Sequence, residues 1–174
     1  MERNGQVKSI VETSVFITIV FIGVYLIKIP APGGYVHIGD SMIFLAVLFL
    51  GTKRGALAGG IGAALSDVLG GYGVWILPTF FLKGIMALIM GTLISKKLLG
   101  LKGRSLWIIS ATIAGIVQIA GYAVVTGILY GKAMGIASIP GLILQVAVGL
   151  VIAIVLSEAL SKTSLKNKYA YEIF

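Results

Sequence analysis

The residues of this chain that could do chemistry are few, and they interrupt strongly apolar segments. Asp40 and Asp67 carry charges near the ends of such segments, Lys83 carries one within a segment, and Gln118 and Gln145 place amides inside two others. Charged and amide groups are costly in hydrocarbon, so they usually face the interior of a helix bundle or a wet cavity and find partners there. These residue types favour the binding of a small polar molecule.

Catalysis finds little support in the same residues. The chain has no cysteine, which excludes disulfides, thiolate metal sites and a cysteine nucleophile, and it has one histidine. It contains no HExxH motif, no Ser/His/Asp set at a sensible depth and no paired intramembrane aspartates. The glycine-rich run GALAGGIG lies in an apolar segment and lacks the GK[ST] ending of a phosphate loop. We therefore expect no enzymatic activity, metal or cofactor, and any ATP must be used by a partner.

The composition identifies the class of protein. Of the 174 residues, 58% are hydrophobic and only 11% are charged, and the mean hydropathy is +1.06. Such values are typical of an integral membrane protein, whose first partner is the lipid bilayer. The formal charge of +8 could suggest nucleic acid, but the basic residues fall between apolar runs rather than on one soluble face. No nucleic-acid partner is expected.

The apolar segments predict an all-α fold of six transmembrane helices in a single domain, residues 1–174. The segments lie at about 10–29, 38–51, 55–70, 74–95, 105–130 and 138–161. The second and third are shorter than the roughly 20 residues of a straight span, so they should be tilted or buried by their neighbours. Of the 14 lysine and arginine residues, eleven fall on one side when the amino terminus is placed inside. By the positive-inside rule both termini are then cytoplasmic, in a multi-pass protein of the cell membrane.

Small residues recur at every fourth position in the third segment. This seam consists of Gly51, Gly55, Gly59, Ala63 and Asp67. A second series on the fourth segment consists of Thr79, Lys83, Ala87, Gly91 and Ser95. Residues four apart share one helix face, and small side chains allow close approach, so the simplest interpretation is a pair of tightly packed antiparallel helices. Asp67 and Lys83 then lie toward one end of the pair, where they either bind each other or contact a ligand.

With this orientation, a rise of about 1.5 Å per residue places the polar side chains in the outer half of the membrane. The fifth segment adds Tyr122, one helical turn beyond Gln118, and Tyr72 follows the turn after the third segment. The pattern favours an outward-facing pocket. The candidate ligand-binding residues are His37, Asp40, Asp67, Tyr72, Lys83, Gln118, Tyr122 and Gln145.

Several candidates also have a purely structural interpretation. Asp40, with Ser41, belongs to the residue types that cap helix starts. His37 and Tyr72 suit the membrane interface. Asp67 could hold two helices together through Lys83, or accept hydrogen bonds from the following glycine turn.

Residues 37–91 resemble the substrate-binding S components of energy-coupling factor (ECF) vitamin transporters. The run HIGDSMIFLAVLFLGTKRGALAGGIGAALSDVLGGYGVWILPTFFLKGIMALIMG carries a GDS start to the second helix, a Gly/Ala-rich third helix ending in Asp, a GY turn, and P-T and K-G on the fourth helix. The resemblance implies a six-helix protein of the prokaryotic plasma membrane that captures a micronutrient with high affinity from outside. It also implies a transmembrane coupling (T) subunit and two cytoplasmic ABC-type ATPases as partners.

The resemblance further implies roles for two segments. The outer loop after the first helix covers the ligand in this family, and the matching segment here is Ile29 to Ile38. The family also tends to dock its coupling subunit through an Ala-x-x-x-Ala face on the first helix. This chain departs from that pattern: Ser14 and Thr18 occupy the best matching spacing, with Ser9 and Thr13 as a second small pair.

The mixture of amides, tyrosines, one histidine and nearly balanced charges suits a small polar heteroaromatic ligand. Pyridoxine-like and hydroxymethylpyrimidine-like vitamins or precursors are the favoured substrates. An alternative is a self-sufficient secondary transporter or channel that uses Asp67 and Lys83 as a proton or ion relay, although the inverted repeats of such carriers are not evident. A purely structural membrane scaffold would explain the small-residue seams but not the gathering of polar groups in one leaflet.

Overall fold

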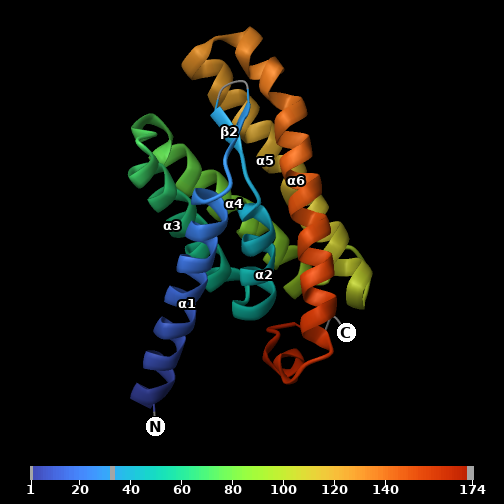
Figure 1. Cartoon of the computed structure of the whole chain (residues 1–174). Helices are drawn as coiled ribbons and strands as arrows, with labels where there is room; N and C mark the ends of the chain where they lie inside the picture. Colours follow the sequence, from blue (N-terminus) through green and yellow to red (C-terminus); the bar gives the residue numbers. More distant parts are fainter. Residues whose placement is uncertain (1, 32–33, 172–174) are drawn as a thin grey trace.

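The computed structural model describes residues 2–31 and 34–171. Within these residues the fold is all-α, with six α-helices and one short β-hairpin (Figure 1). The elements in chain order are α1 (Glu2–Tyr25), β1 (Ile29–Ala31), β2 (Gly34–Val36), α2 (Gly39–Leu50), α3 (Thr52–Gly70), η1 (Gly73–Trp75), α4 (Ile76–Ser95), α5 (Gly103–Tyr130), α6 (Lys132–Ser161) and η2 (Ser164–Lys168).

Glycines with positive φ separate the helices at three junctions. Gly51 (φ 80°) stands between α2 and α3, Gly71 (φ 77°) ends α3, and Gly131 (φ 95°) stands between α5 and α6. Side chains are disfavoured in this backbone region, so glycine is the natural residue for each turn. The helix ends therefore follow directly from the sequence.

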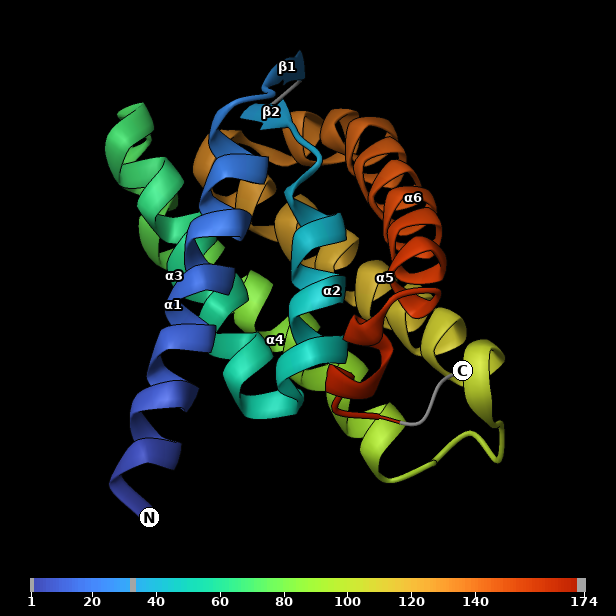
Figure 2. The ribbon, with the colours of Figure 1, turned by 60° about the horizontal axis from the view of Figure 1, so that its bottom comes forward.

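Four of the described helical segments are long and apolar enough to cross a membrane: Gly5–Tyr25, Gly73–Ser95, Gly103–Tyr130 and Lys132–Ser161. The 12-residue helix α2 is too short, but ten of its residues are buried. It runs through the middle of the bundle with other helices around it (Figure 2). Neighbouring helices thus shield its backbone from lipid, as we expect for a short apolar segment.

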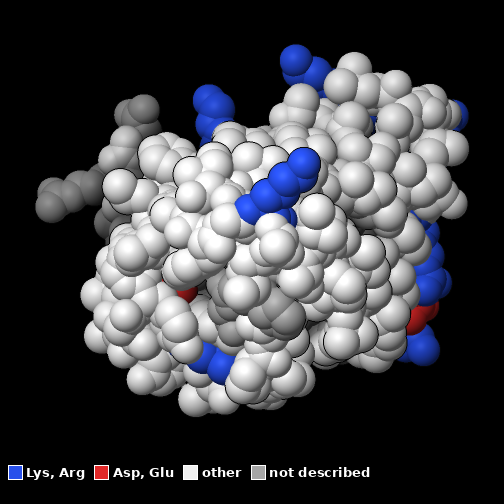
Figure 3. Space-filling view, turned by 90° about the horizontal axis from the view of Figure 1, so that it is seen from above, with Lys and Arg blue, Asp and Glu red and all other residues white. Residues whose placement is uncertain are grey.

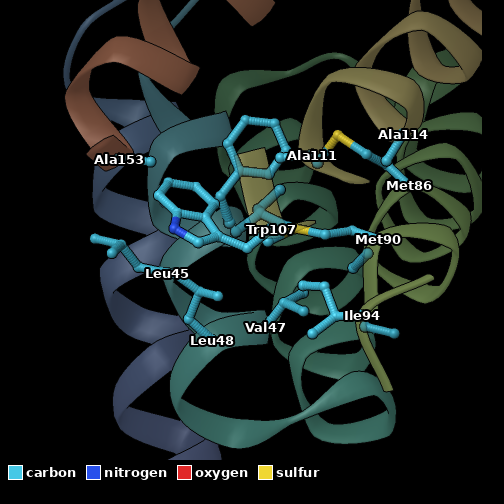
Figure 4. Packing of buried hydrophobic residues seen from close by; sticks show 14 of the residues in the cluster. Leu45, Val47, Leu48, Met86, Met90, Ile94, Trp107, Ala111, Ala114 and Ala153 are labelled. Atoms are coloured by element: carbon cyan, nitrogen blue, oxygen red, sulfur yellow. The ribbon is translucent and has the colours of Figure 1, made fainter. Parts of the chain in front are cut away.

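The apolar core lies between α2, α4 and α5. Trp107 of α5 is its largest fully buried side chain, and the same cluster contains Met86 and Met90 of α4 and Leu45 and Leu48 of α2 (Figure 4). Methionine is flexible enough to fill the gaps around a large indole ring. This core holds together three of the helices that carry polar residues of the site.

The small-residue seam of α3 does allow close approach, but it faces α2 rather than α4. A Cβ atom on Gly55 would lie 2.7 Å from Val47 Cα, and one on Gly59 would lie 2.9 Å from Ile43 Cγ2. Helix α4 also packs on α3, through different glycines: a Cβ on Gly60 would meet the Phe80 carbonyl oxygen at 2.9 Å. The predicted close packing of α3 with α4 is thus confirmed, and a Cβ on Gly91 of the α4 series would lie 2.8 Å from Thr52 Cα of α3. The α3 seam itself meets α2 instead, because periodicity defines a helix face without defining its neighbour.

The start of α1 and the segment η2 lie at one end of the bundle, together with the α2–α3 and α4–α5 junctions (Figure 2). Two ion pairs lie near this end, Arg54–Glu12 at 3.0 Å and Arg104–Glu158 at 2.8 Å. The hairpin, the Gly71 turn and the Gly131 turn form the opposite end (Figure 1). We call this opposite end the hairpin end, and it contains the site.

Candidate substrate-binding site

A cavity opens at the hairpin end between the hairpin and helices α3 to α6. Its aromatic lining comes from Tyr35, Tyr72, Trp75 and Tyr122. Its polar lining comes from His37, Asp67, Thr79, Thr126, Ser138 and Gln145. Seen from above, the molecule is mostly uncharged, with a few scattered lysine or arginine side chains and fewer aspartate or glutamate side chains (Figure 3).

The aromatic residues form two pairs of rings. The Trp75 and Tyr122 rings are stacked, with centroids 5.7 Å apart and an angle of 27° between their planes. The Tyr35 and Tyr72 ring centroids lie 4.8 Å apart. Aromatic pairs of this kind give a pocket rigid, flat walls, which suit a planar ring.

Two polar contacts fasten the hairpin to the rest of the bundle. Its strands pair antiparallel, with Pro30 opposite Tyr35, and the Tyr35 hydroxyl donates a 2.7 Å hydrogen bond to Asp67 Oδ1. The Lys28 ammonium lies 4.5 Å from the Tyr35 ring centroid and 4.9 Å from that of Tyr72, within cation–π range. Partial burial lowers the pKa of Lys28, and the nearby Asp67 carboxylate opposes that change. The hairpin therefore lies over the cavity with two polar attachments.

A fully buried polar cluster lies behind the cavity and is centred on Asp40. Lys83 Nζ lies 2.5 Å from Asp40 Oδ1. Gln118 and Gln145 each donate from Nε2 to Asp40 Oδ2, at 2.8 and 3.0 Å. A buried charge is tolerated only when it is paired and hydrogen-bonded, and here α4, α5 and α6 all supply partners to α2. Gly149 permits this approach, because a Cβ there would lie 2.9 Å from Asp40 Cβ.

His37 connects the hairpin to this cluster. Its backbone N–H donates to Gln145 Oε1 at 3.3 Å, and its Nδ1 accepts from the backbone N–H of Gly39 at 3.0 Å. Burial, and next the positive charge of Lys83, lower the pKa of His37 to about 3. The imidazole ring is therefore neutral at physiological pH.

The family model of the ECF-type riboflavin transporter S component matches residues 4–162 of the chain. The chain belongs to this family. It is 37% identical over 126 residues to an uncharacterized protein in the gap 3′ region of Pyrococcus woesei, covering 72% of this chain and 82% of that protein. It is also 27% identical over 169 residues to the thiamine precursor transporter HmpT of Lactococcus lactis subsp. cremoris (strain MG1363), covering 95% of each chain.

The family membership confirms the resemblance carried by residues 37–91 and extends it over nearly the whole chain. The chain is a transporter component rather than a member of an enzyme family, and its apolar helices fit a multi-pass protein of the cell membrane. The structure then shows how this S component arranges the residues that the sequence singled out.

Five of the eight candidate ligand-binding residues line the cavity: His37, Asp67, Tyr72, Tyr122 and Gln145. The other three, Asp40, Lys83 and Gln118, lie behind it in the buried cluster. Whether the lining residues bind substrate stays a prediction.

Two expected local arrangements were wrong. Asp40 does not cap α2 with its side chain; it is the second residue of that helix, and its carboxylate is turned into the bundle. Among the described residues, Lys83 forms its ion pair with Asp40 and none with Asp67, whose Oδ1 accepts from Tyr35. The Asp67–Lys83 pair is therefore replaced by two separate contacts, one behind the cavity and one at its wall.

Sequence reasoning missed Tyr35 and Thr79 as lining residues. A signal for Tyr35 was present, since residues two apart on an extended strand point to the same side, and His37 was already a candidate. Thr79 had been assigned only to a helix seam, and its hydroxyl faces the Asp67 carboxyl group.

The residues expected to dock the coupling subunit are exposed on α1. Ser14 and Thr18 both face away from the bundle, and the Thr18 hydroxyl donates to the Ser14 carbonyl oxygen at 3.0 Å. The Thr18 hydroxyl is thus satisfied within its own helix, which suits a face that meets lipid or another apolar helix. Docking through it stays a prediction.

Proposed function

We propose that this S component is the substrate-capture subunit of an ATP-driven ECF-type importer and that it binds a small water-soluble vitamin or precursor in the cavity at the hairpin end. The observation that carries the proposal is the cavity itself. It combines aromatic walls with a few fixed polar groups, and the hairpin lies over it. Small-molecule sites generally have this composition.

The membrane arrangement is part of the proposal. All six helices cross or enter the bilayer, both termini face the cytoplasm, and the hairpin end faces outward. The asymmetry of the basic residues supports this orientation. The chain carries no nucleotide-binding motif, so transport requires a transmembrane T subunit and two cytoplasmic ABC-type ATPases.

The proposed substrate is a compact heteroaromatic compound, with hydroxymethylpyrimidine-like molecules ahead of pyridoxine-like ones. The Tyr35–Tyr72 and Trp75–Tyr122 pairs suit stacking on one planar ring system. Similarity over nearly the full chain to a thiamine precursor transporter supports the pyrimidine. The family is described as a riboflavin transporter component, so the binding experiment below must also test whether the chain binds riboflavin instead.

The experiment is native mass spectrometry of the purified protein, followed by calorimetric titration with each candidate. We expect release of one small heteroaromatic molecule and tight binding of the same molecule by the isolated chain. Reconstituted liposomes should show no sustained uptake until the T subunit and the ATPases are added. Concentrative uptake by this chain alone under an ion gradient would refute the proposal in favour of a secondary carrier.

A further inference from the structure

The two ring nitrogens of His37 have different surroundings. His37 lies between β2 and α2, is only 8% exposed, and lines the cavity. Nδ1 is turned toward the start of α2, where it meets the backbone N–H of Gly39 at 3.0 Å. Among the described residues no hydrogen bond is made by Nε2, so this nitrogen is free to meet an occupant of the cavity.

The contact with Gly39 determines the tautomer. A backbone N–H can only donate, so Nδ1 must be the unprotonated acceptor, and in a neutral ring the proton then lies on Nε2. Burial and the Lys83 charge keep the ring neutral, with a pKa of about 3. His37 thus presents an uncharged N–H donor across the physiological pH range.

Neighbouring residues also fix the position of the ring. Gly39 has no side chain, and a Cβ there would lie 3.0 Å from Nδ1 and 2.3 Å from Val24 Cγ2, so only glycine fits between the ring and α1. The His37 backbone N–H is bound to Gln145, which is held in turn by Asp40. Because the backbone of His37 is held in this way, its Nε2–H group has a defined direction. Recognition of a single ligand atom requires such a direction.

We propose that His37 is a specificity-determining residue of this S component, whose Nε2–H donates a hydrogen bond to an unprotonated ring nitrogen of the heteroaromatic substrate. This inference rests on the proposed function and narrows it to aromatic rings that carry a free nitrogen acceptor. A ring whose nitrogen is replaced by C–H leaves the buried donor unpaired and binds less tightly.

The test combines two variants with matched ligands. The probe is 4-amino-5-hydroxymethyl-2-methylpyrimidine, and its controls are the two pyridines in which one ring nitrogen is replaced by C–H. His37→Asn keeps an acceptor near the position of Nδ1 for the Gly39 N–H but lacks the Nε2 donor. His37→Gln places an amide N–H near the position of Nε2. Binding is measured by calorimetry for every pair, with thermal stability recorded for each variant.

We expect the effect of each His37 substitution on affinity to depend on whether the ligand carries the ring nitrogen. The natural protein should bind the pyrimidine about tenfold more tightly than one of the two pyridines. In His37→Asn the affinity for the pyrimidine should fall by about the same factor, and the affinity for that pyridine should hardly change. In His37→Gln most of the affinity for the pyrimidine should be recovered.

Other outcomes overturn the inference in distinguishable ways. Equal binding of the pyrimidine and both pyridines by the natural protein would refute the hydrogen bond while leaving the proposed function intact. An equal loss for all ligands in His37→Asn would make the residue structural. Failure of the natural protein to bind any of these rings, with riboflavin or a non-aromatic molecule retained instead, would refute both the inference and the substrate class on which it rests.

Discussion

Lys83 and Asp40 form an ion pair from which water is excluded: their side chains have no exposed surface, and Nζ lies 2.5 Å from Oδ1. The pair joins α4 to α2, and Gln118 and Gln145 complete the hydrogen bonding of the carboxylate from α5 and α6. It therefore fixes the relative rotation of four helices at the depth where the cavity ends. We infer that the pair serves to hold one arrangement of these helices, because the cost of burying two charges offsets much of their electrostatic attraction.

Removing one member of the pair should be strongly destabilising. Lys83→Met leaves the Asp40 carboxylate buried without a counter-ion, which should lower the free energy of unfolding by about 3–5 kcal/mol. The double variant Lys83→Met with Asp40→Asn should recover much of that loss, whereas Lys83→Met with Asp67→Asn should not. Thermal and denaturant unfolding in detergent compares the three proteins. Equal rescue by both double variants would contradict the assignment of Asp40 as the partner.

The packing of α3 on α2 can be tested with two matched glycine substitutions. Gly55→Ala places a Cβ 2.7 Å from Val47 Cα, so the two backbones must separate, and we expect a loss of about 1–3 kcal/mol in unfolding free energy. Gly84→Ala, in α4, has as its nearest neighbour the Ala56 carbonyl oxygen at 3.8 Å. The unfolding free energy of this variant should be unchanged or higher by up to about 1 kcal/mol, because alanine has the higher helix propensity. Equal stability of the two variants would refute the close approach.

The Tyr35–Asp67 hydrogen bond should slow the escape of a bound substrate. Tyr35→Phe keeps the ring between His37 and Tyr72 but releases Asp67, so the hairpin loses one of its attachments. We expect substrate dissociation to become about two- to tenfold faster, with little change in the association rate. Tyr25→Phe makes the same chemical change at the end of α1, where the Tyr25 ring is exposed and lies 4.9 Å from the Lys28 ammonium. In stopped-flow measurements this control should behave like the natural protein.

The lowered pKa of His37 predicts loss of stability in acid. In the unfolded chain the imidazole takes up a proton below its usual pKa of about 6.5, whereas in the folded protein it stays neutral until about pH 3. The unfolded state therefore binds more protons in this window, and stability falls as the pH falls. Between pH 7 and pH 4.5 this group should remove on the order of 2 kcal/mol.

The matched control for this effect is His37→Gln, which cannot titrate. Its unfolding free energy should depend less steeply on pH over the same window, and the difference between the two proteins isolates the contribution of the imidazole. Parallel pH profiles would contradict the neutral, buried state of His37.

The proposed orientation can be tested because the chain contains no cysteine. Val74→Cys introduces a thiol beside the Gly71 turn, and Leu98→Cys introduces one at the opposite end; both positions are more than half exposed, at 58% and 60%. A membrane-impermeant thiol reagent applied to intact cells should label the first variant and not the second. The reverse labelling pattern would invert the topology.

The sequence by itself determined the class of protein and the division into helices. Apolar segments bounded by Gly51, Gly71 and Gly131 are found as six separate helices, because hydropathy and backbone conformation are local properties of the chain. The depth of the polar side chains along the helices was also predictable. Because each helical residue adds a fixed rise, these side chains gather in the half of the bundle that contains the hairpin. Five of the predicted binding residues line one cavity for that reason.

Only the tertiary structure decided which of these groups meet. Asp40 and Asp67 stand near the same end of adjacent helices, and nothing in their spacing tells which carboxylate faces Lys83. That choice depends on the rotation of each helix about its axis, which is set by packing, such as Gly55 on Val47 and Gly149 on Asp40. The position of Tyr35 likewise depends on a short hairpin with no helical periodicity. Its contact with Asp67 spans 32 residues of sequence and exists only because the chain folds back over the cavity.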